Sequence, residues 1–400
     1  MLNLNHNARL LIAIHTIHSV IELFINTFLV AYFLNLTGNN IIPAAMFYIF
    51  TYGMLSLFFP LLGPFVKCGN KLAAYRLSFL INAVMLLLII WLKQNVTSYI
   101  WILGSFLGLE KALFYFPQNL LSSQEAGGAV IVRFHGYRSA LAGAAKIIMP
   151  VIFGWFISVD SFINTAAFVL LLTAAELVLS FFITGRASYH KPFCIKALLA
   201  LMLKRSKIKS ALVIDFINGF IFDILDVLVV LYVVYMFKTN LNLGIFTSVF
   251  AVLTVLSNAF FGRFCRYGSF SIFLSFCSLL TFSGAAYFVF DTTEVSFVIY
   301  NLTFSSAAQL IRTMTSINAF KVSQDKSVAS LYRAEYLALR EIFLNLGRIF
   351  GFFLVIIAVW SHRPDMLKYL ILSLSIMIVF MGYLSVNLSR CLCEKEKDKC

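Results

Sequence analysis

The stretch HTIHSVIELFIN, residues 15–26, places polar side chains inside a run of Leu, Ile, Phe and Val. On a helix, at about 100° per residue, His15, His18, Glu22 and Asn26 fall within about 80° of one another. A charged side chain at the centre of a bilayer costs at least about 2.5–3.5 kcal/mol, so it must face a partner or water. The stripe therefore predicts one polar face that lines a hydrated path, with the apolar face toward lipid or other helices.

Similar stripes occur on several other apolar segments. They comprise Glu110, Lys111, Tyr115 and Gln118 in 98–120; Lys146 in 136–158; Asp215, Asn218, Asp223 and Asp226 in 211–237; Asn301, Ser305, Gln309, Arg312 and Ser316 in 295–319; and Arg340, Glu341, Asn345 and Arg348 in 335–360. Stripes on several helices can share one water-filled cavity. We therefore expect these segments to surround a common path.

The residue types indicate three kinds of role. We expect substrate contacts from Asn26, Lys111, Tyr115, Gln118, Asn218, Gln309 and Arg312, since a permanently charged guanidinium in a span needs a carboxylate or an anionic ligand. We expect proton coupling from His15, His18, Glu22, Asp223 and Asp226, because burial favours the neutral carboxyl form and His titrates near neutral pH. We expect ion pairs between 98–120, 136–158 and 335–360 from Glu110, Lys146, Arg340, Glu341 and Arg348.

Each of these residues also has a structural interpretation. Glu22 could be a neutral, hydrogen-bonded group, and the two histidines could simply pack. Asp215 could be a solvated cap near a helix end. We interpret Glu176 as a structural residue.

Composition defines the elements that must position these side chains. The chain has 400 residues, of which 61% are hydrophobic and 12% charged, about half the charged fraction of a soluble domain. Apolar runs of about 20 residues recur, each long enough to cross a bilayer, and the first is too long for a secretory signal. The expected spans are 9–34, 41–62, 72–92, 98–120, 136–158, 162–183, 211–237, 241–262, 269–290, 295–319, 335–360 and 367–389.

Charge and cysteine placement predict the orientation. Most loop lysines and arginines lie in alternate connections, above all in 185–210, so the positive-inside rule places both termini in the cytoplasm. We attribute the net charge of +14 to topology and anionic lipid, not to nucleic acid. The cysteines fall on the inner side or, for Cys277, within a span, so we expect no disulfide. The cluster at 391, 393 and 400 lacks a metal spacing, and we expect an unstructured tail.

The chain repeats itself. GPFVKCGNK, with Gly63, Lys67 and Gly69, resembles GRFCRYGSF, with Gly262, Arg266 and Gly268. His15, His18 and Asn26 likewise correspond to Asp215, Asn218 and Asp226. We expect two six-helix halves, 1–184 and 211–390, a basic linker 185–210 whose segment 193–209 forms an amphipathic helix on the membrane surface, and a cytoplasmic tail 391–400.

Together, twelve spans, inner termini, a basic middle loop and a Gly-basic-Gly loop after spans 2 and 8 resemble the major facilitator superfamily. The chain departs from the family's loop motif, since Lys67 stands where an Asp is expected and the second Gly comes one residue early. The resemblance implies an all-α polytopic membrane protein whose first, fourth, seventh and tenth spans line a central cavity. Those spans carry polar stripes here.

We therefore expect a secondary active transporter that moves a small polar or anionic solute by alternating access, coupled to protons. An efflux antiporter for lipophilic or cationic compounds, or for lipid, remains open, as does a non-transporting receptor on the same fold. The chain contains no HExxH, GxSxG or phosphate-loop motif, so we expect neither an enzyme nor a self-contained ATP-driven pump. We expect a monomer in a bacterial inner membrane, with no cofactor or metal.

Overall fold

The computed structural model describes residues 4–66, 71–125, 130–184, 193, 206–264, 270–323, 333–361 and 365–397, and these parts of the chain are helical with short connections. They form two compact units. The first unit comprises Met1–Phe193 with Val230–Val249, and the second comprises Cys194–Val229 with Phe250–Cys400. Helices α9 and α10 therefore contribute to both units.

The first unit opens with a continuous helical run. That run consists of α1 (His6–Leu23), the π-helical segment η1 (Phe24–Leu29) and α2 (Val30–Leu36). The other elements of the unit are α3 (Ile42–Phe65), α4 (Lys71–Leu92), the 3-10 segment η3 (Lys93–Tyr99), α5 (Ile100–Glu125), α6 (Val130–Val159) and α7 (Phe162–Phe181). The side chain of Asn5 caps α1 by accepting from the Ala8 amide at 2.8 Å, which satisfies one of the free donors of a helix start. Lys93 has a left-handed φ of 51°, which interrupts the helix where α4 gives way to α5.

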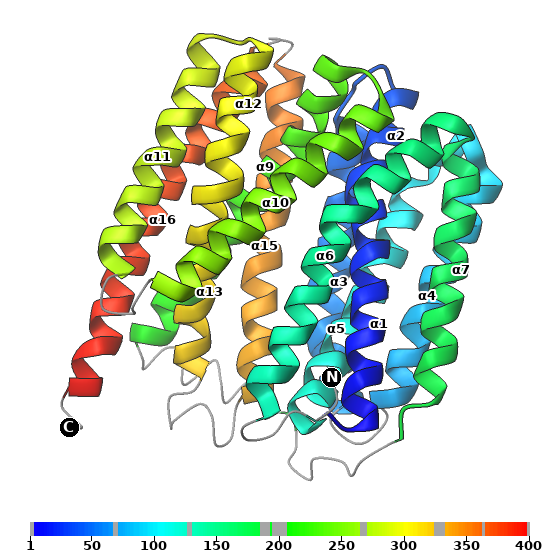
Figure 1. Ribbon diagram of the computed structural model, residues 1–400, viewed down its shortest axis with the longest axis horizontal. Helices are drawn as coiled ribbons and strands as arrows, with labels where there is room; N and C mark the ends of the chain where they lie inside the picture. Colours follow the sequence, from blue (N-terminus) through cyan, green and yellow to red (C-terminus); the bar gives the residue numbers. More distant parts are fainter. Residues whose placement is uncertain are drawn as a thin grey trace. The chain divides into compact units, whose positions relative to one another are not determined.

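Packing in this unit surrounds α1 and α5. Helix α1 packs against α6 and α7, while α5 packs between α3 and α4, as can be followed in Figure 1. Gly104 and Gly108 lie against the backbone carbonyls of Phe47 and Thr51 on α3. A side chain at either glycine would hold the two backbones apart, so this GxxxG spacing permits the close crossing.

The second unit contains the remaining helices, except for the end of α9 and the start of α10, which belong to the first unit. They are α9 (Ser206–Phe237), α10 (Asn240–Phe264), α11 (Phe270–Phe290), α12 (Glu294–Thr303), the π-helical segment η5 (Phe304–Ala308), α13 (Gln309–Ser323), α15 (Arg333–Trp360) and α16 (Met366–Lys397). Helix α11 packs along α16 and beside α12 (Figure 1). Helices α9 and α15 cross closely because Gly219 faces the Leu344 carbonyl and Gly347 faces the Phe216 carbonyl.

The structure supports a multi-pass membrane protein. In the described parts of the chain, ten helical stretches are long and apolar enough to cross a membrane. One of them, Lys71–Ser122, contains α4, η3 and α5, and α4 packs against α5, so it accommodates two of the expected spans. The run α12–α13 is not among the ten, because Arg312, Lys321 and several hydroxyl and amide residues interrupt its apolar character. Twelve crossings and cytoplasmic termini stay predictions.

Several expected boundaries differ from the observed ones. Gly63 and Gly262 lie within α3 and α10 rather than in loops, because these helices continue to Phe65 and Phe264. Lys67, Gly69, Arg266 and Gly268 lie outside the described residues, as does most of the expected surface helix 193–209. Helix α9 begins at Ser206, and α16 continues to Lys397. The expectation of an unstructured tail from residue 391 was therefore wrong for 391–397.

Candidate functional site

The first unit holds an ion pair between α1 and α5. Lys111 Nζ lies 2.6 Å from Glu22 Oε1, and the two side chains are 11% and 21% exposed. The Lys111 ammonium also lies 6.0 Å from the centre of the Tyr115 ring. The sequence alone predicts separate roles for these residues, proton coupling for Glu22 and substrate contact for Lys111. The structure joins them, so either role must involve both residues.

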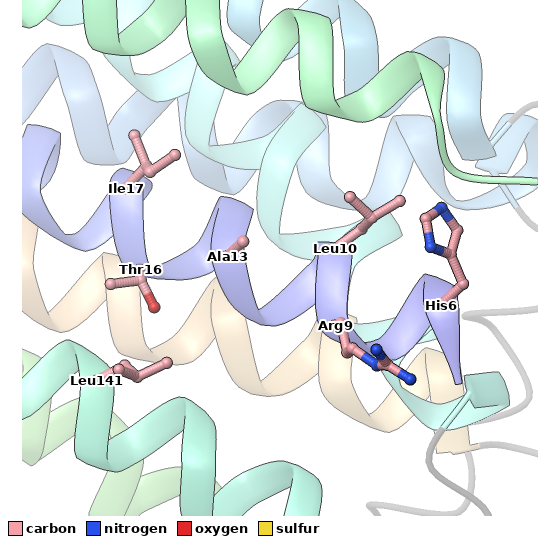
Figure 2. Close-up of a pocket in the computed structure, with 7 residues that line it drawn as sticks. All are labelled: His6, Arg9, Leu10, Ala13, Thr16, Ile17 and Leu141. Carbon is pink, nitrogen blue, oxygen red and sulfur yellow. The ribbon is translucent and has the colours of Figure 1, made fainter. Parts of the chain in front are cut away.

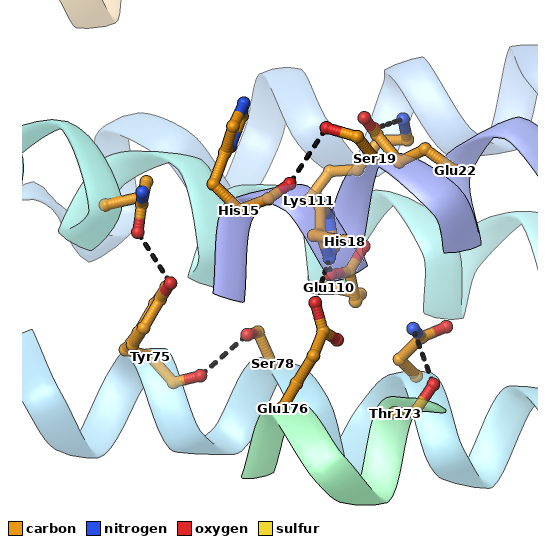
Figure 3. Close-up of polar contacts among 12 residues, drawn as sticks. His15, His18, Ser19, Glu22, Tyr75, Ser78, Glu110, Lys111, Thr173 and Glu176 are labelled. Atoms are coloured by element: carbon orange, nitrogen blue, oxygen red, sulfur yellow. Dashed lines mark hydrogen bonds and ion pairs between the residues drawn. The ribbon is translucent and has the colours of Figure 1, made fainter. Parts of the chain in front are cut away.

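One helical turn away, His18 is enclosed by two carboxyl groups. Its Nε2 lies 3.7 Å from Glu110 Oε1 on α5, and its Nδ1 lies 3.3 Å from Glu176 Oε1 on α7. The imidazole stacks on Phe114 with ring centres 3.5 Å apart. Figure 3 shows His18 in the middle of this group. The structural interpretation of Glu176 missed this contact; a single carboxylate in the otherwise apolar sequence of α7 was the available signal.

Neutral hydrogen bonds connect the surrounding helices. Tyr75 on α4 donates to Gln118 Oε1 on α5 at 2.5 Å, and Tyr48 on α3 donates to Asn26 Oδ1 in η1 at 3.3 Å. Gln118 is buried and Asn26 is exposed. Among the expected path residues of this unit, Asn26 is therefore accessible, whereas Gln118 is enclosed by packing. His15 is half-buried, and its Nδ1 makes no hydrogen bond to the described residues.

Lys146 differs from its expected role. Its side chain on α6 is exposed, and it forms no ion pair with the described residues of its unit within 4.0 Å. Glu110 pairs with His18 instead of joining Lys146. Glu110 and Lys146 therefore do not belong to one ion-pair network, because Glu110 on α5 faces α1 and α7.

A groove of about 550 Å³ lies along α1 and α6. It is lined by His6, Arg9, Leu10, Ala13, Thr16, Ile17 and Leu141, which are drawn in Figure 2. At about 100° per residue, these α1 positions lie opposite the stripe of His15, His18 and Glu22. The polar stripe of α1 is therefore directed mainly toward α5 and α7, and the open groove borders its other face.

The second unit holds a corresponding network between α9 and α15. Arg340 Nε lies 2.8 Å from Asp215 Oδ2, and Arg348 Nε lies 2.8 Å from Asp223 Oδ2. The partners are 125 positions apart in both pairs, so two parallel helices pair in register. Arg348 also donates to Asn345 Oδ1 at 2.7 Å. The expectation that Arg340 and Arg348 would pair with 98–120 or 136–158 missed these partners on α9.

Arg312 on α13 is the more open part of this network. It lies 3.4 Å from Asp226 Oδ2 and 3.8 Å from Asp223 Oδ2. The Arg312 and Asp226 side chains are 33% and 46% exposed, and the guanidinium lies 5.3 Å from the Phe222 ring centre. This ion pair is therefore partly exposed, whereas the pairs of Arg340 and Arg348 are more deeply buried.

The other predicted residues of this unit occupy less central positions. Asn218 is buried and Gln309 half-buried. Glu341 is half-buried and forms no ion pair with the part of its unit that the structure describes. Both π-helical segments lie in polar-stripe helices: η1 follows Glu22, and η5 precedes Gln309. Such segments often occur at functional sites, and the helical periodicity of the sequence does not reveal them.

Comparison with known proteins places the fold. No protein-family model matches the sequence. The chain is 22% identical over 362 residues to the uncharacterized protein YqgE of Bacillus subtilis (strain 168), covering 89% of this chain and 84% of YqgE. A bacterial homologue of the iron transporter ferroportin, in an inward-facing state, superposes with a TM-score of 0.68 and 13% identity, covering 96% of this chain and 97% of that one. The human organic anion transporter MFSD10 (TETRAN) superposes with a TM-score of 0.65 and 12% identity, covering 95% and 100%.

These likenesses define the class of fold. Both solved structures are transporters of the major facilitator superfamily, and each covers nearly the whole chain. The fold of this protein is that of the major facilitator superfamily, which confirms the resemblance found in the sequence. At 12–13% identity, the likeness defines the fold alone, and the function has to be argued from the side chains.

Proposed function

We propose that this protein is a secondary active transporter that moves a small polar or anionic solute by alternating access, coupled to protons. It would cross the membrane twelve times, with both termini in the cytoplasm and six helices in each half. Two solved transporters of the same fold support this proposal. We further propose a monomer in a bacterial inner membrane, with 1–184 and 211–390 as the two halves.

The observation that carries the proposal is the partly accessible ion pair in each unit. Glu22 and Lys111 are 21% and 11% exposed in the first unit, while Asp226 and Arg312 are 46% and 33% exposed in the second. Buried charges cost free energy that a close partner only partly recovers. Groups retained in this way are typical of substrate and ion pathways inside membranes.

The Glu22–Lys111 pair suggests how a proton and an anion could be linked. Protonation of Glu22 would remove the negative partner from Lys111. A carboxylate or phosphate group of the solute could then take the vacated position beside the ammonium. Because each event favours the other, the anion and the proton would bind together, which is the linkage that symport requires.

A second candidate is a transporter of cationic compounds. The network of the second unit contains the acids Asp215, Asp223, Asp226 and Glu341 against the bases Arg312, Arg340 and Arg348, so it carries an excess of acid when all are ionised. One of the two solved structures of similar fold is a bacterial homologue of ferroportin, which is described as a transporter of iron, a cation. Among the described residues, however, no group of three or more His, Cys, Asp or Glu side chains has a geometry that could hold a metal ion.

Charge movement in proteoliposomes tests the two candidates. Pools of organic anions, amino acids, sugars and organic cations would be applied in turn to protein on a solid-supported membrane, at several pH values. We expect a sustained, pH-dependent current with an anionic or zwitterionic pool, which Glu22→Gln and Arg312→Ala each reduce about tenfold or more. Asp160→Asn, at an exposed helix connection, is the matched control.

The other outcomes are equally specific. A sustained current with the cation pool alone would favour the second candidate. Transient binding signals without turnover in every pool would contradict the transporter proposal and favour a receptor. Because an electroneutral exchanger gives no current, uptake of radiolabelled solutes would accompany the screen, and its absence in all pools would exclude the proposed activity for those solutes.

A further inference from the structure

One imidazole and two carboxyl groups from three helices are almost completely buried in the first unit. His18 on α1, Glu110 on α5 and Glu176 on α7 have side-chain exposures of 2%, 2% and 0%. Figure 3 shows both carboxyl groups beside the same ring. We call these three residues the buried triad.

The triad has fewer hydrogen bonds than buried groups normally have. Both nitrogens of His18, Oε1 of Glu110 and both carboxyl oxygens of Glu176 lack a well-aligned hydrogen bond to the described residues. Within the described parts of this unit, no Lys or Arg lies within 4.0 Å of either carboxyl group. Buried polar groups are usually satisfied, so the imidazole at 3.3 and 3.7 Å is the main compensation for two acids.

Charge balance then determines how many protons the triad holds. With a neutral imidazole and two carboxylates it carries two negative charges, and two added protons make it neutral. Because an uncompensated buried charge is costly, the neutral state with two protons is favoured while the triad is buried as in this structure. Release of one proton leaves a single negative charge, shared by three groups whose titrations are coupled.

The charged and titratable neighbours come from every helix packed around the triad. They are His15 and Glu22 on α1, Tyr75 on α4, and Lys111 and Tyr115 on α5. Arg138 on α6 interacts with His15, Tyr75 and Tyr115 rather than with the triad itself. Glu22 and Lys111 already neutralise each other at 2.6 Å. Glu110 immediately precedes Lys111, and His18 lies one turn before Glu22, so a charge on the triad acts directly on this ion pair.

We propose that His18, Glu110 and Glu176 together bind and release the coupling proton, with Glu22 and Lys111 responding to the charge that remains. This inference rests on the proposed function and deepens it. It replaces a single proton-binding carboxyl with a shared site that includes Glu176, which the sequence analysis interpreted as structural. The proton leaves the triad to water, no bond other than O–H or N–H is broken, and the ammonium of Lys111 gains a second negative neighbour.

Infrared difference titration tests the proton site without a known solute. The full chain in lipid nanodiscs would be taken through a pH series, and the carbonyl stretch of protonated carboxyl groups recorded. We expect a titrating carboxyl band in the wild type and in Glu22→Gln. Because the groups titrate together, Glu110→Gln and Glu176→Gln should each remove the band or shift its midpoint by at least tenfold in proton concentration.

A labelling experiment needs no substitution and so does not depend on how the variants fold. Isotopically labelled glutamate in the wild type should shift the titrating band, because all acids of the triad are glutamates. An unshifted band would place the proton on an aspartate, such as those of the second unit, and would overturn the proposal. Loss of the band in Glu22→Gln, with the band unchanged in Glu110→Gln and Glu176→Gln, would overturn the proposal as well.

The coupling role has its own readout once a transported solute is known. Glu176→Gln should retain solute exchange between the two sides while losing proton-driven accumulation at least tenfold. Unchanged accumulation in Glu176→Gln would contradict the coupling role even if the band titrates. Conversely, a titrating triad in a protein that transports nothing would contradict the proposed function and leave the proton-binding site supported.

Discussion

At the scale of single residues, we expect the Glu22–Lys111 pair to contribute to the stability of the fold as well as to the proposed function. Its nitrogen and oxygen are 2.6 Å apart in a largely buried position. Removal of one partner from a fully buried pair costs about 3–5 kcal/mol, because the other charge is left uncompensated. The partial exposure of Glu22 lets water reduce this cost, so we expect a loss of about 1–3 kcal/mol for Lys111→Met.

Thermal unfolding in detergent measures this effect. We expect a lower unfolding temperature for Lys111→Met and for Glu22→Gln, and partial recovery in the double variant, where no charge is left alone. Asp160→Asn serves as the reference because its carboxylate lies at an exposed connection. Additive losses in the double variant would show that the two side chains do not stabilise each other.

Arg312 presents a different kind of charge, one accessible to solvent and close to two acids. If the guanidinium contacts the solute, Arg312→Ala should reduce uptake about tenfold or more, which corresponds to about 1.4 kcal/mol. Arg312→Lys should retain part of the uptake, because it keeps the charge but loses the planar fork. Initial uptake rates in proteoliposomes at several solute concentrations measure both variants, and equal rates in Lys, Ala and wild type would exclude the contact.

At the scale of helices, close backbone contacts determine which side chains can meet. Gly108 on α5 lies against the Thr51 carbonyl on α3, whereas Gly53 on α3 has open space where a Cβ would be. We expect Gly108→Ala to destabilise the protein by about 1–3 kcal/mol, since the contact is with backbone that cannot move aside easily. Gly53→Ala, a matched change on the facing helix, should leave the unfolding temperature unchanged or slightly raised.

The same substitution has a consequence for the site. Because α5 also carries Glu110 and Lys111, a displaced α5 should weaken proton binding by the triad as well. A Gly108→Ala protein with wild-type stability would show that this helix crossing is looser than the contact indicates.

The helices also show how far the sequence allowed the site to be predicted. Periodicity was sufficient to place His18, Glu22, Asp223 and Arg348 on polar faces, because a charge in an apolar helix has few alternatives. It could not pair them, since periodicity gives the polar face of one helix and not the helix that packs against it. Glu176, a partner of His18, even comes from a helix with no polar stripe. The repeated interval of eight residues in Asp215/Asp223 and Arg340/Arg348 was a usable signal that these two helices pair, whereas their parallel direction is seen only in the contacts.

At the scale of the whole molecule, the fold was predictable because length, apolarity and charge placement constrain a membrane protein strongly. Helix ends were less predictable: α3, α10 and α16 continue past their expected limits because helical hydrogen bonding continues where the apolar run stops. The largest difference between prediction and structure is the direction of the polar face of α1. This face was expected to line a hydrated path, but it packs against α5 and α7. The sequence of one helix does not show which helices pack against it.

Charge placement makes a prediction about orientation that labelling can test. Cys391 on α16 is exposed, and Gln94, in the η3 connection between α4 and α5, is exposed as well. If the positive-inside rule holds, Cys391 faces the cytoplasm and Gln94 the outside. In an otherwise cysteine-free chain, a membrane-impermeant maleimide added to intact cells should label Gln94→Cys and should label Cys391 only after permeabilisation. Labelling of Cys391 in intact cells would reverse the proposed topology, and with it the side from which the Lys-rich connections meet anionic lipid.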